Sequence, residues 1–278
     1  MSAWPPELPE EAFTRRVVSW LAARFPGSSF EFQDPLGLRI EHPDGSQRDA
    51  RLDNLWRSYR VDAAGFPTVI EHYARAVEET LDPASRAPGL EDVVPLVRSL
   101  SWVREVHAAL ASHSADPKDE PVASPLVADL CIVLAFDREH GIQVLRREDM
   151  QELDREAGAL LTRGLENLAR RLPEPELRAL QGVTMVSAGG NYESSLLLFD
   201  GLWMQLAGDL EGDLLAAAPT RDLVLFSDDA RLGAREELRS VADALFAESS
   251  HPVSPALLRF TPRGWVAVDD PGEDEEES

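Results

Sequence analysis

The sequence predicts an α+β fold in which antiparallel hairpins of strands pack against amphipathic helices. Three observations favour this class. At least seven strand-like segments are spread along the 278 residues. Turn residues such as Asp44-Gly45 join neighbouring alternating segments, which is typical of hairpins. Helices with an apolar period of 3.6 residues are interspersed with these strands. Together they favour antiparallel hairpins over a doubly wound parallel sheet.

The first 88 residues predict an N-terminal α/β subdomain. An amphipathic helix spans Glu10 to Phe25 and ends at Pro26-Gly27. A second helix runs from Phe66 to Leu81, with apolar residues at the helical period. A connector from Asp82 to Gly89 contains two prolines and marks the predicted boundary. The strands predicted between the helices are SSFEFQ at 28–33, LGLRIEH at 36–42 and SQRDARL at 46–52.

Beyond the connector, the segment from Val93 to Leu172 begins with the strand VVPLVRS and a helix from Leu100 to Leu110. The polar, proline-containing stretch His113–Ser124 is interpreted as a surface loop. The apolar run Ala128–Phe136 predicts a buried strand. The chain turns over 137–141 and returns as IQVL, and the longest predicted helix spans 153–172. Gly164 on its apolar face predicts a close helix crossing.

The most apolar part of the chain runs from Val183 to Asp229. It predicts a strand, a glycine turn, an apolar helix and a strand hairpin. The helix Phe199–Leu206 is expected at the centre of the core. A further helix spans 231–246, LLRFTPRGWVAV at 257–268 forms a closing hairpin, and 269–278 form a disordered acidic tail.

Residues 93–172 and 183–246 show the same element order, β-α-β-β-α. Each second strand opens with a similar tripeptide, Ala-Asp-Leu at 128–130 and Gly-Asp-Leu at 212–214. An internal duplication explains this agreement, and chance similarity of pattern is the alternative. The predicted organisation is therefore a subdomain at 1–88, two β-α-β-β-α repeats with a closing hairpin within 89–268, and a tail at 269–278.

The net charge is −23, and the last ten residues carry seven carboxylates and no basic group. Removing them leaves −16, so the acidity also belongs to the folded region. Such a charge repels phosphate backbones and anionic membrane surfaces, and we expect neither nucleic-acid nor membrane binding. The single cysteine, Cys131, permits no internal disulfide. Neither a signal peptide nor a spanning segment is indicated, and a cytoplasmic protein is expected.

Three segments carry a family resemblance: PLVRSLSW, GGNYESSLLL and GDLLAAAPTRDLVLFSD. In their order and in the spacing from Gly189 to Asp228 they resemble the YtpQ-like family of uncharacterised bacterial proteins. The resemblance covers about Val93 to Val268. It implies kinship of fold and a bacterial cytosolic setting. The family is a domain of unknown function, so it implies no catalytic residues.

Candidate ligand-binding residues are Gly189, Gly190, Asn191 and Glu193, because a glycine turn before a helix can hold an anion through free N–H groups. The spacing matches no P-loop or GxGxxG motif. A simple helix cap by Asn191, Ser194 or Ser195 is the alternative, and Glu193 at a helix start would repel an anion.

Two more candidates lie at strand ends. Arg98 follows a strand, where a guanidinium can bind a carboxylate through two hydrogen bonds, although a structural ion pair is favoured in so acidic a chain. Asp228, with Asp229, follows another strand, where such residues bind metal or cap a helix; capping of the helix that follows is the simpler interpretation.

Other chemistry is not indicated. Counted from Asp209, the acidic run LAGDLEGDLL lacks the glycine and glutamate positions of a calcium loop. The six histidines are scattered and form no metal motif, and Cys131 lies inside an apolar strand. We therefore expect no metal and no cofactor.

The favoured hypothesis is a non-catalytic protein that binds another protein, such as an antagonist that masks a basic partner. The alternative is a small-ligand-binding protein or enzyme with its site near the turn 188–194. Sequence gives no indication of the oligomeric state.

Overall fold

The computed structural model describes residues 4–5, 7–41, 45, 47–81, 88–111, 116–138, 141–180 and 182–268. Three predicted features lie largely or wholly outside these residues: the hairpin turn at 42–44, the connector at 82–87 and the tail at 269–278. The chain divides into two compact units. The N-terminal unit comprises the described residues up to Pro88 together with 137–143. The C-terminal unit comprises Gly89–Ala111, Asp116–Phe136 and the residues from Val144 onward.

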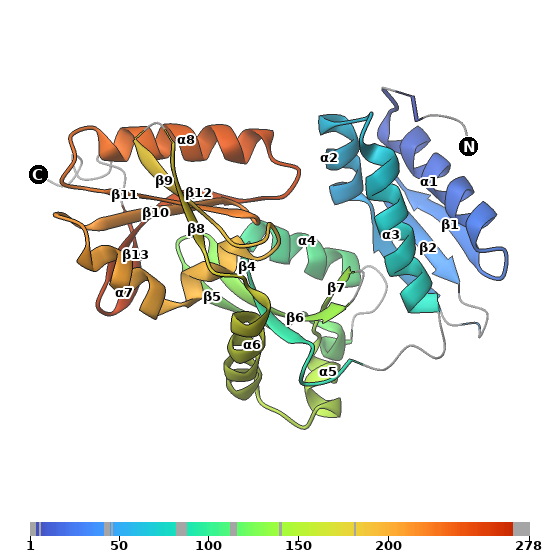
Figure 1. The fold of residues 1–278 in the computed structure, drawn as a ribbon. Helices are drawn as coiled ribbons and strands as arrows, with labels where there is room; N and C mark the ends of the chain where they lie inside the picture. Colours follow the sequence, from blue (N-terminus) through green and yellow to red (C-terminus); the bar gives the residue numbers. More distant parts are fainter. Residues whose placement is uncertain are drawn as a thin grey trace, which may run out of the picture. The chain divides into compact units, whose positions relative to one another are not determined.

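The N-terminal unit combines one antiparallel sheet with three helices (Figure 1). The aromatic residues of the helices stack in its core: Phe13 from α1 lies 5.1 Å from Tyr59 of α2 and 5.5 Å from Phe66 of α3, measured between ring centroids. Such pairs add to the free energy gained by burying the rings. The elements are α1 (Glu10–Arg24), β1 (Ser29–Asp34), β2 (Gly37–Glu41), β3 (Gln47–Arg51), α2 (Asp53–Val61) and α3 (Phe66–Leu81).

In the C-terminal unit, β4 (Val93–Ser99) pairs antiparallel with β6 (Leu130–Arg138). Strand β6 also pairs with β5 (Ala123–Val127). The end of β6 at Asp137–Arg138, and most of β7 (Gly141–Val144) with which β6 pairs, belong to the N-terminal unit. Gly164 of helix α6 faces β4, where an added Cβ would lie 3.0 Å from Pro95 Cδ, so glycine permits close approach to a strand and not the predicted crossing of another helix. The helical segments here are α4 (Leu100–Ala111), η1 (Pro117–Asp119), α5 (Arg147–Glu152) and α6 (Ala157–Arg171).

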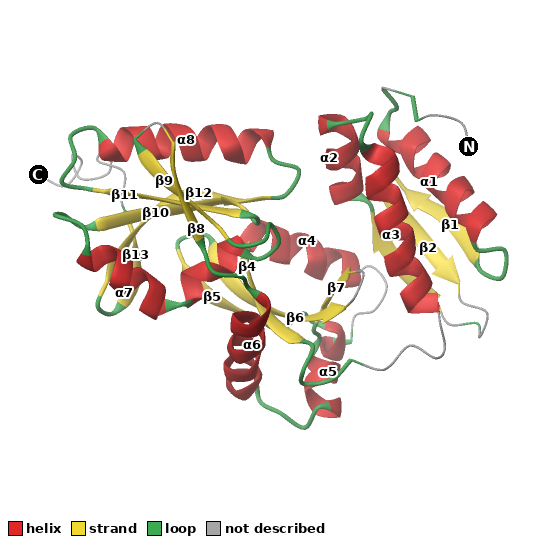
Figure 2. Ribbon diagram, viewed as in Figure 1, coloured by secondary structure: helices red, strands yellow, loops and turns green. Residues whose placement is uncertain are grey.

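A six-stranded antiparallel sheet forms the rest of this unit, in the order β13-β12-β10-β11-β9-β8. Helix α8 lies along one face, and η2 and α7 lie on the other (Figures 1 and 2). Central strand β10 is buried along its whole length, as expected for a strand covered on both faces. The bounds are β8 (Glu176–Leu180), β9 (Val183–Ser187), η2 (Glu193–Leu198), α7 (Asp200–Gly208), β10 (Leu214–Thr220), β11 (Leu223–Asp228), α8 (Ala234–Glu248), β12 (Pro252–Thr261) and β13 (Gly264–Ala267).

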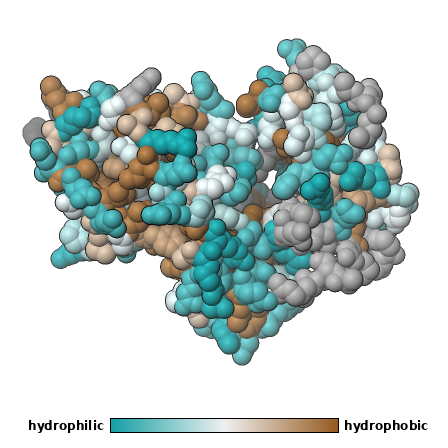
Figure 3. Space-filling view, viewed as in Figure 1, coloured by the Kyte–Doolittle hydropathy of each residue, from teal (hydrophilic) through white to brown (hydrophobic). Residues whose placement is uncertain are grey.

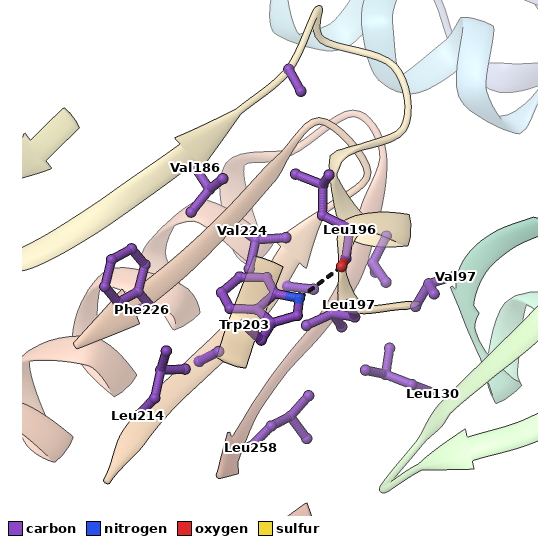
Figure 4. Close-up of a cluster of buried hydrophobic side chains, with 14 residues drawn as sticks. Val97, Leu130, Val186, Leu196, Leu197, Trp203, Leu214, Val224, Phe226 and Leu258 are labelled. Carbon is purple, nitrogen blue, oxygen red and sulfur yellow. Dashed lines mark hydrogen bonds between the residues drawn. The ribbon is translucent and has the colours of Figure 1, made fainter. Parts of the chain in front are cut away.

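The largest buried side chain, Trp203 of α7, anchors one side of this sheet (Figure 4). Its indole N–H donates a hydrogen bond of 2.7 Å to the Leu196 carbonyl, which satisfies the polar atom of a fully buried ring. Trp203 is the only residue of α7 that is fully buried, whereas Met204 is 58% exposed. The expectation that the whole helix lies at the centre of the core is therefore wrong: the 3-10 segment η2 contributes Leu196 and Leu197 instead.

The two predicted repeats share strand order and hairpin register. In each, the first strand pairs with the third and the third with the second, giving β4-β6-β5 and β9-β11-β10. Pairs Ala123↔Val133 and Val127↔Leu130 recur 93 positions later as Ala216↔Phe226 and Thr220↔Leu223. Both hairpins also shift register just before the turn. This correspondence is the one that a duplicated unit requires.

The same register corrects the tripeptide alignment of the sequence analysis. Residues 128–130 correspond to Arg221-Asp222-Leu223, and not to 212–214. The misalignment arose because β5, which contains Pro125, was interpreted as the end of a loop. Strand β7 consequently has no counterpart in the second repeat.

Other predicted elements differ at their ends. The helix expected over 153–172 is α6, which begins four residues later, at Ala157, because the chain turns at Asp154 with φ of 52°; the short helix α5 before this turn was not predicted. Helix α2 and strand β8 were not predicted. Within the part of the chain that the structure describes, no helix has both the length and the apolar character needed to cross a membrane. On the face drawn in Figure 3, apolar side chains are interspersed with polar ones over both units.

Candidate functional site

The candidate site begins at the free edge of β4, which pairs with β6 on its other side. Two serine hydroxyls of η2 occupy this edge at Val97. The Val97 N–H donates to Ser195 Oγ at 3.0 Å, and Ser194 Oγ donates to the Val97 carbonyl at 3.2 Å. Both serines are fully buried. They therefore satisfy the backbone groups that a neighbouring strand would otherwise bind, and neither acts as the helix cap considered above.

Arg98 follows Val97 and is partly buried. Its Nη1 donates to the Val97 carbonyl at 2.8 Å and lies 3.5 Å from Ser194 Oγ, while Cζ lies 5.9 Å from the Trp102 ring centroid. Burial lowers the pKa of Arg98 to about 10, and the charge of Arg221 adds to this shift. Among the described residues no carboxylate pairs with Arg98, so the structural ion pair favoured from sequence is wrong.

Arg221 lies in the turn between β10 and β11. Its backbone is fixed on both sides: the N–H donates to the His251 carbonyl, and the carbonyl accepts from the Ser194 N–H, both at 3.1 Å. Its side-chain Nε is buried and has no hydrogen-bond partner among the described residues. Burial lowers the pKa of Arg221, and the nearby Asp222, Tyr192 and Glu193 oppose that shift.

The glycine turn brings Glu193 to the same place. Gly189 and Gly190 have φ of 95° and 83°, which only glycine adopts without strain. This conformation turns successive N–H groups inward, and the buried Glu193 carboxylate accepts from Ala188 at 2.7 Å, from Tyr192 at 3.0 Å and from Gly190. The turn therefore binds the protein's own carboxylate, and Glu193 occupies the N–H groups that the sequence analysis offered to a ligand anion.

We call Arg98, Arg221, Tyr192, Glu193 and Ser194 the arginine centre. Ser194 connects the two arginines, because its hydroxyl lies beside Arg98 and its N–H binds the Arg221 carbonyl. The Glu193 carboxylate is occupied by backbone N–H groups and makes no ion pair with either guanidinium. Two cations that repel each other in a partly buried place can bind an oxyanion through their forked N–H groups.

The other residues predicted for the site lie apart from this centre. Asn191 is exposed and makes no hydrogen bond. Asp228 lies at the far end of β11 from Arg221 and accepts from the N–H groups of Glu211, Gly212 and Ala230 at 2.9–3.0 Å. These hydrogen bonds lower its pKa.

The predicted capping of the helix after β11 is also wrong. Helix α8 begins at Ala234, and its N-cap is Gly233. Asp228 instead stabilises the loop at 211–212, and Asp229 forms an ion pair with Arg235 of α8. Neither carboxylate is placed at the first turn of the helix as a cap.

Sequence reasoning did not assign Arg221 or Tyr192 to a site. Arg221-Asp222 was interpreted only as the hairpin turn. Only the strand pairings of the structure show how the arginines are related: Arg221 corresponds to Ala128 and Arg98 corresponds to Val186, so each repeat carries one arginine where the other has an apolar residue.

Cys131 pairs with Arg98 across the sheet and belongs to the core, 1% exposed. Its thiol donates to the Arg98 carbonyl at 3.3 Å, and burial raises its pKa to about 11. A thiol in this state is a poor nucleophile at neutral pH. Within the described ranges, no three or more His, Cys, Asp or Glu side chains gather in a way that could hold a metal ion.

Comparison with protein-family models, curated proteins and solved structures gave no match to this chain. The site is therefore interpreted from its own geometry.

Proposed function

We propose that the protein binds a small anionic ligand, one that carries a carboxylate or phosphate group, at the arginine centre. The observation that carries this proposal is the buried Nε of Arg221, which has no partner among the described residues and lies beside a second arginine. Buried polar groups are almost always hydrogen-bonded, so a buried N–H without a protein partner calls for an explanation, and we propose that a bound anion provides it.

The energetics favour the same interpretation. Burial lowers the pKa of both arginines, and the charge of Arg221 lowers the pKa of Arg98 further, so burial disfavours the charged form of each. An oxyanion between them would supply opposite charge and accept N–H donors, and it would raise both pKa values. Arginine is suited to this role because its planar fork matches carboxylate and phosphate geometry.

Binding without catalysis fits the surroundings of the arginines. The hydroxyls of Ser194 and Ser195 already bond to Val97, and no histidine or carboxylate hydrogen-bonds to either hydroxyl among the described residues. A serine nucleophile needs an adjacent base. We therefore place the protein among ligand-binding proteins of the cytosol, and we infer kinship with the YtpQ-like family from the three segments quoted above.

Isothermal titration with inorganic phosphate and, separately, with malonate tests the proposal. The wild-type protein is expected to bind at least one of them. The Arg221→Gln variant is expected to lose that binding. Arg263→Gln is the matched control, because Arg263 is an exposed arginine in another hairpin turn and its side chain has no hydrogen-bond partner. Equal binding by the Arg221→Gln variant, or no heat with either anion, would refute an anion site at this centre.

A basic protein partner is the second candidate, supported by the net charge of −23. A pull-down from cell extract at low and at moderate salt tests it. Recovery of a basic protein that is released as salt rises is the expected result, and recovery of no partner at either salt concentration would count against it.

A further inference from the structure

Strand β8 forms an open edge of the six-stranded sheet. It pairs with β9 on one side and is the terminal strand of the sheet on the other. Glu176, Leu177, Arg178 and Ala179 are all exposed. An open edge strand offers unpaired N–H and C=O groups to a further strand, and proteins usually protect such edges.

The hairpin turn decides which backbone groups of β8 point outward. Leu180 pairs with Val183 across a two-residue turn, so these residues form a hydrogen-bonded pair. Hydrogen-bonded and non-hydrogen-bonded pairs alternate along an antiparallel ladder. Arg178 and Glu176 therefore bond to β9, whereas the N–H and C=O groups of Leu177 and Ala179 point away from the sheet.

The side chains of β8 separate by face. Leu177 lies opposite Val186, whose side chain is in the core with Trp203, and Leu177 itself is 49% exposed. Arg178 lies opposite Met185, on the face covered by α8. Glu176 shares that face with Arg178, and the two side chains form an ion pair of 2.6 Å. One face of β8 thus carries the apolar side chains of Leu177 and Ala179. The other face carries one negative and one positive charge.

We propose that two copies of this chain associate by antiparallel pairing of β8 with β8, centred on Leu177. In this register the two Leu177 residues exchange backbone hydrogen bonds, and each Ala179 N–H donates to the Pro175 carbonyl of the second copy. The two exposed Leu177 side chains become direct neighbours. Glu176 of each copy lies opposite Arg178 of the other, so the two intrachain ion pairs join into a four-charge ring.

Charge selects this register over the nearest alternative. Pairing centred on Arg178 would also use the outward groups of Leu177 and Ala179, but it would place two guanidinium groups directly opposite each other. Like charges in directly opposed positions destabilise a strand pair. The surface is therefore self-complementary in one register, as an interface with twofold symmetry requires.

The high net charge opposes association at a distance, because each chain carries −23. At physiological ionic strength the Debye length is about 8 Å, so this repulsion is largely screened while the contacts at the strand edge are retained. The dimer is accordingly expected to strengthen as salt rises from very low concentration toward about 0.15 M.

Charge reversal tests the register by sedimentation equilibrium on the full chain. Arg178→Glu places carboxylates opposite each other and is expected to raise the dissociation constant of the dimer about tenfold or more. Combining Glu176→Arg with Arg178→Glu restores opposite charges and is expected to return the constant to the wild-type range. Arg263→Glu changes the net charge equally at another turn and is expected to leave the dimer intact.

A backbone variant tests the edge itself. Proline at Ala179 removes an outward N–H and leaves the β8–β9 hydrogen bonds in place, so Ala179→Pro is expected to give a folded monomer. Its circular dichroism spectrum reports that it is folded. A monomeric wild-type protein at high concentration would overturn the proposal. So would a dimer that tolerates Arg178→Glu and Ala179→Pro, because association would then use another surface.

Discussion

Replacing Arg221 by methionine is expected to stabilise the protein. The Nε of Arg221 is buried without a partner among the described residues, and an unsatisfied buried donor costs about 1–3 kcal/mol. Methionine retains the unbranched apolar stem and removes the donors and the charge. The attraction to the exposed Asp222 is also lost, which costs less than about 1 kcal/mol. The net gain therefore lies between about 0 and 3 kcal/mol.

Urea unfolding followed by circular dichroism measures this gain as a higher midpoint at an unchanged slope. In thermal unfolding the same change corresponds to about 2–4 °C per kcal/mol for a unit of this size. Arg221 lowers the stability of the folded protein and serves anion binding. The methionine variant is therefore expected to be more stable than the wild type and to have lost anion binding. Destabilisation by more than about 1 kcal/mol would refute it, because Arg221 would then have a favourable partner in the folded state.

Three further predictions follow from the packing and the charges. Gly164→Ala places a Cβ 3.0 Å from Pro95 Cδ and is expected to cost about 1 kcal/mol in urea unfolding despite better helix propensity, whereas Gly158→Ala on the same helix meets open space and is expected to gain about 0.5 kcal/mol. The folded pKa of Asp228 is lowered below its usual 3.8, so its contribution is fully present above that pH and is lost as pH falls through the folded pKa. Asp228→Asn is therefore expected to destabilise the protein at pH 7, and a cost that does not shrink as the pH is lowered from 7 to well below 3.8 would contradict this assignment. Cys131, with its pKa raised to about 11, is expected to resist iodoacetamide at pH 8 until urea unfolds the chain, as measured by mass spectrometry; rapid alkylation of the native protein would show that the thiol is accessible.

The sequence predicted those elements whose local pattern and tertiary role agree. Helix α3 spans Phe66 to Leu81, as its apolar period predicts. Strand β4 spans Val93 to Ser99, as its short run rich in valine predicts, because β-branched residues favour strands. In both segments the residues that fit the core also favour the observed conformation.

Prediction failed where tertiary contacts override local pattern. Strand β5 contains Pro125 and is polar and partly exposed, so only its pairing with β6 identifies it. Strand β8 is exposed at nearly every position and therefore lacks the alternation of buried and exposed residues. Helix α6 begins at Ala157 and not at Leu153, because the backbone turns at Asp154, and an apolar period does not reveal such a turn.

The candidate site was predicted in part. The glycine turn does bind a carboxylate, yet the sequence cannot say that Glu193 is long enough to fold back onto it. Arg98 was identified as a strand-end cation. Its neighbour Arg221 is 123 positions away, and only the pairing of β11 with β9 and the contact of η2 with β4 bring the two together. The closeness of Arg98 and Arg221 results from the order in which the strands pair. The number of residues between them in the sequence does not reveal it.

The serine contacts at β4 also bear on the order of folding during synthesis. The bond between Val97 and Ser195 joins residues 98 positions apart, and the edge of β4 remains open until that later segment has emerged from the ribosome. At synthesis rates of about 5–20 residues per second, the nascent strand stays open for roughly 5–20 s. During that interval its apolar residues and unpaired backbone groups are available to other nascent chains or to a chaperone. The number of residues between Val97 and Ser195 thus determines how long the growing polypeptide needs protection.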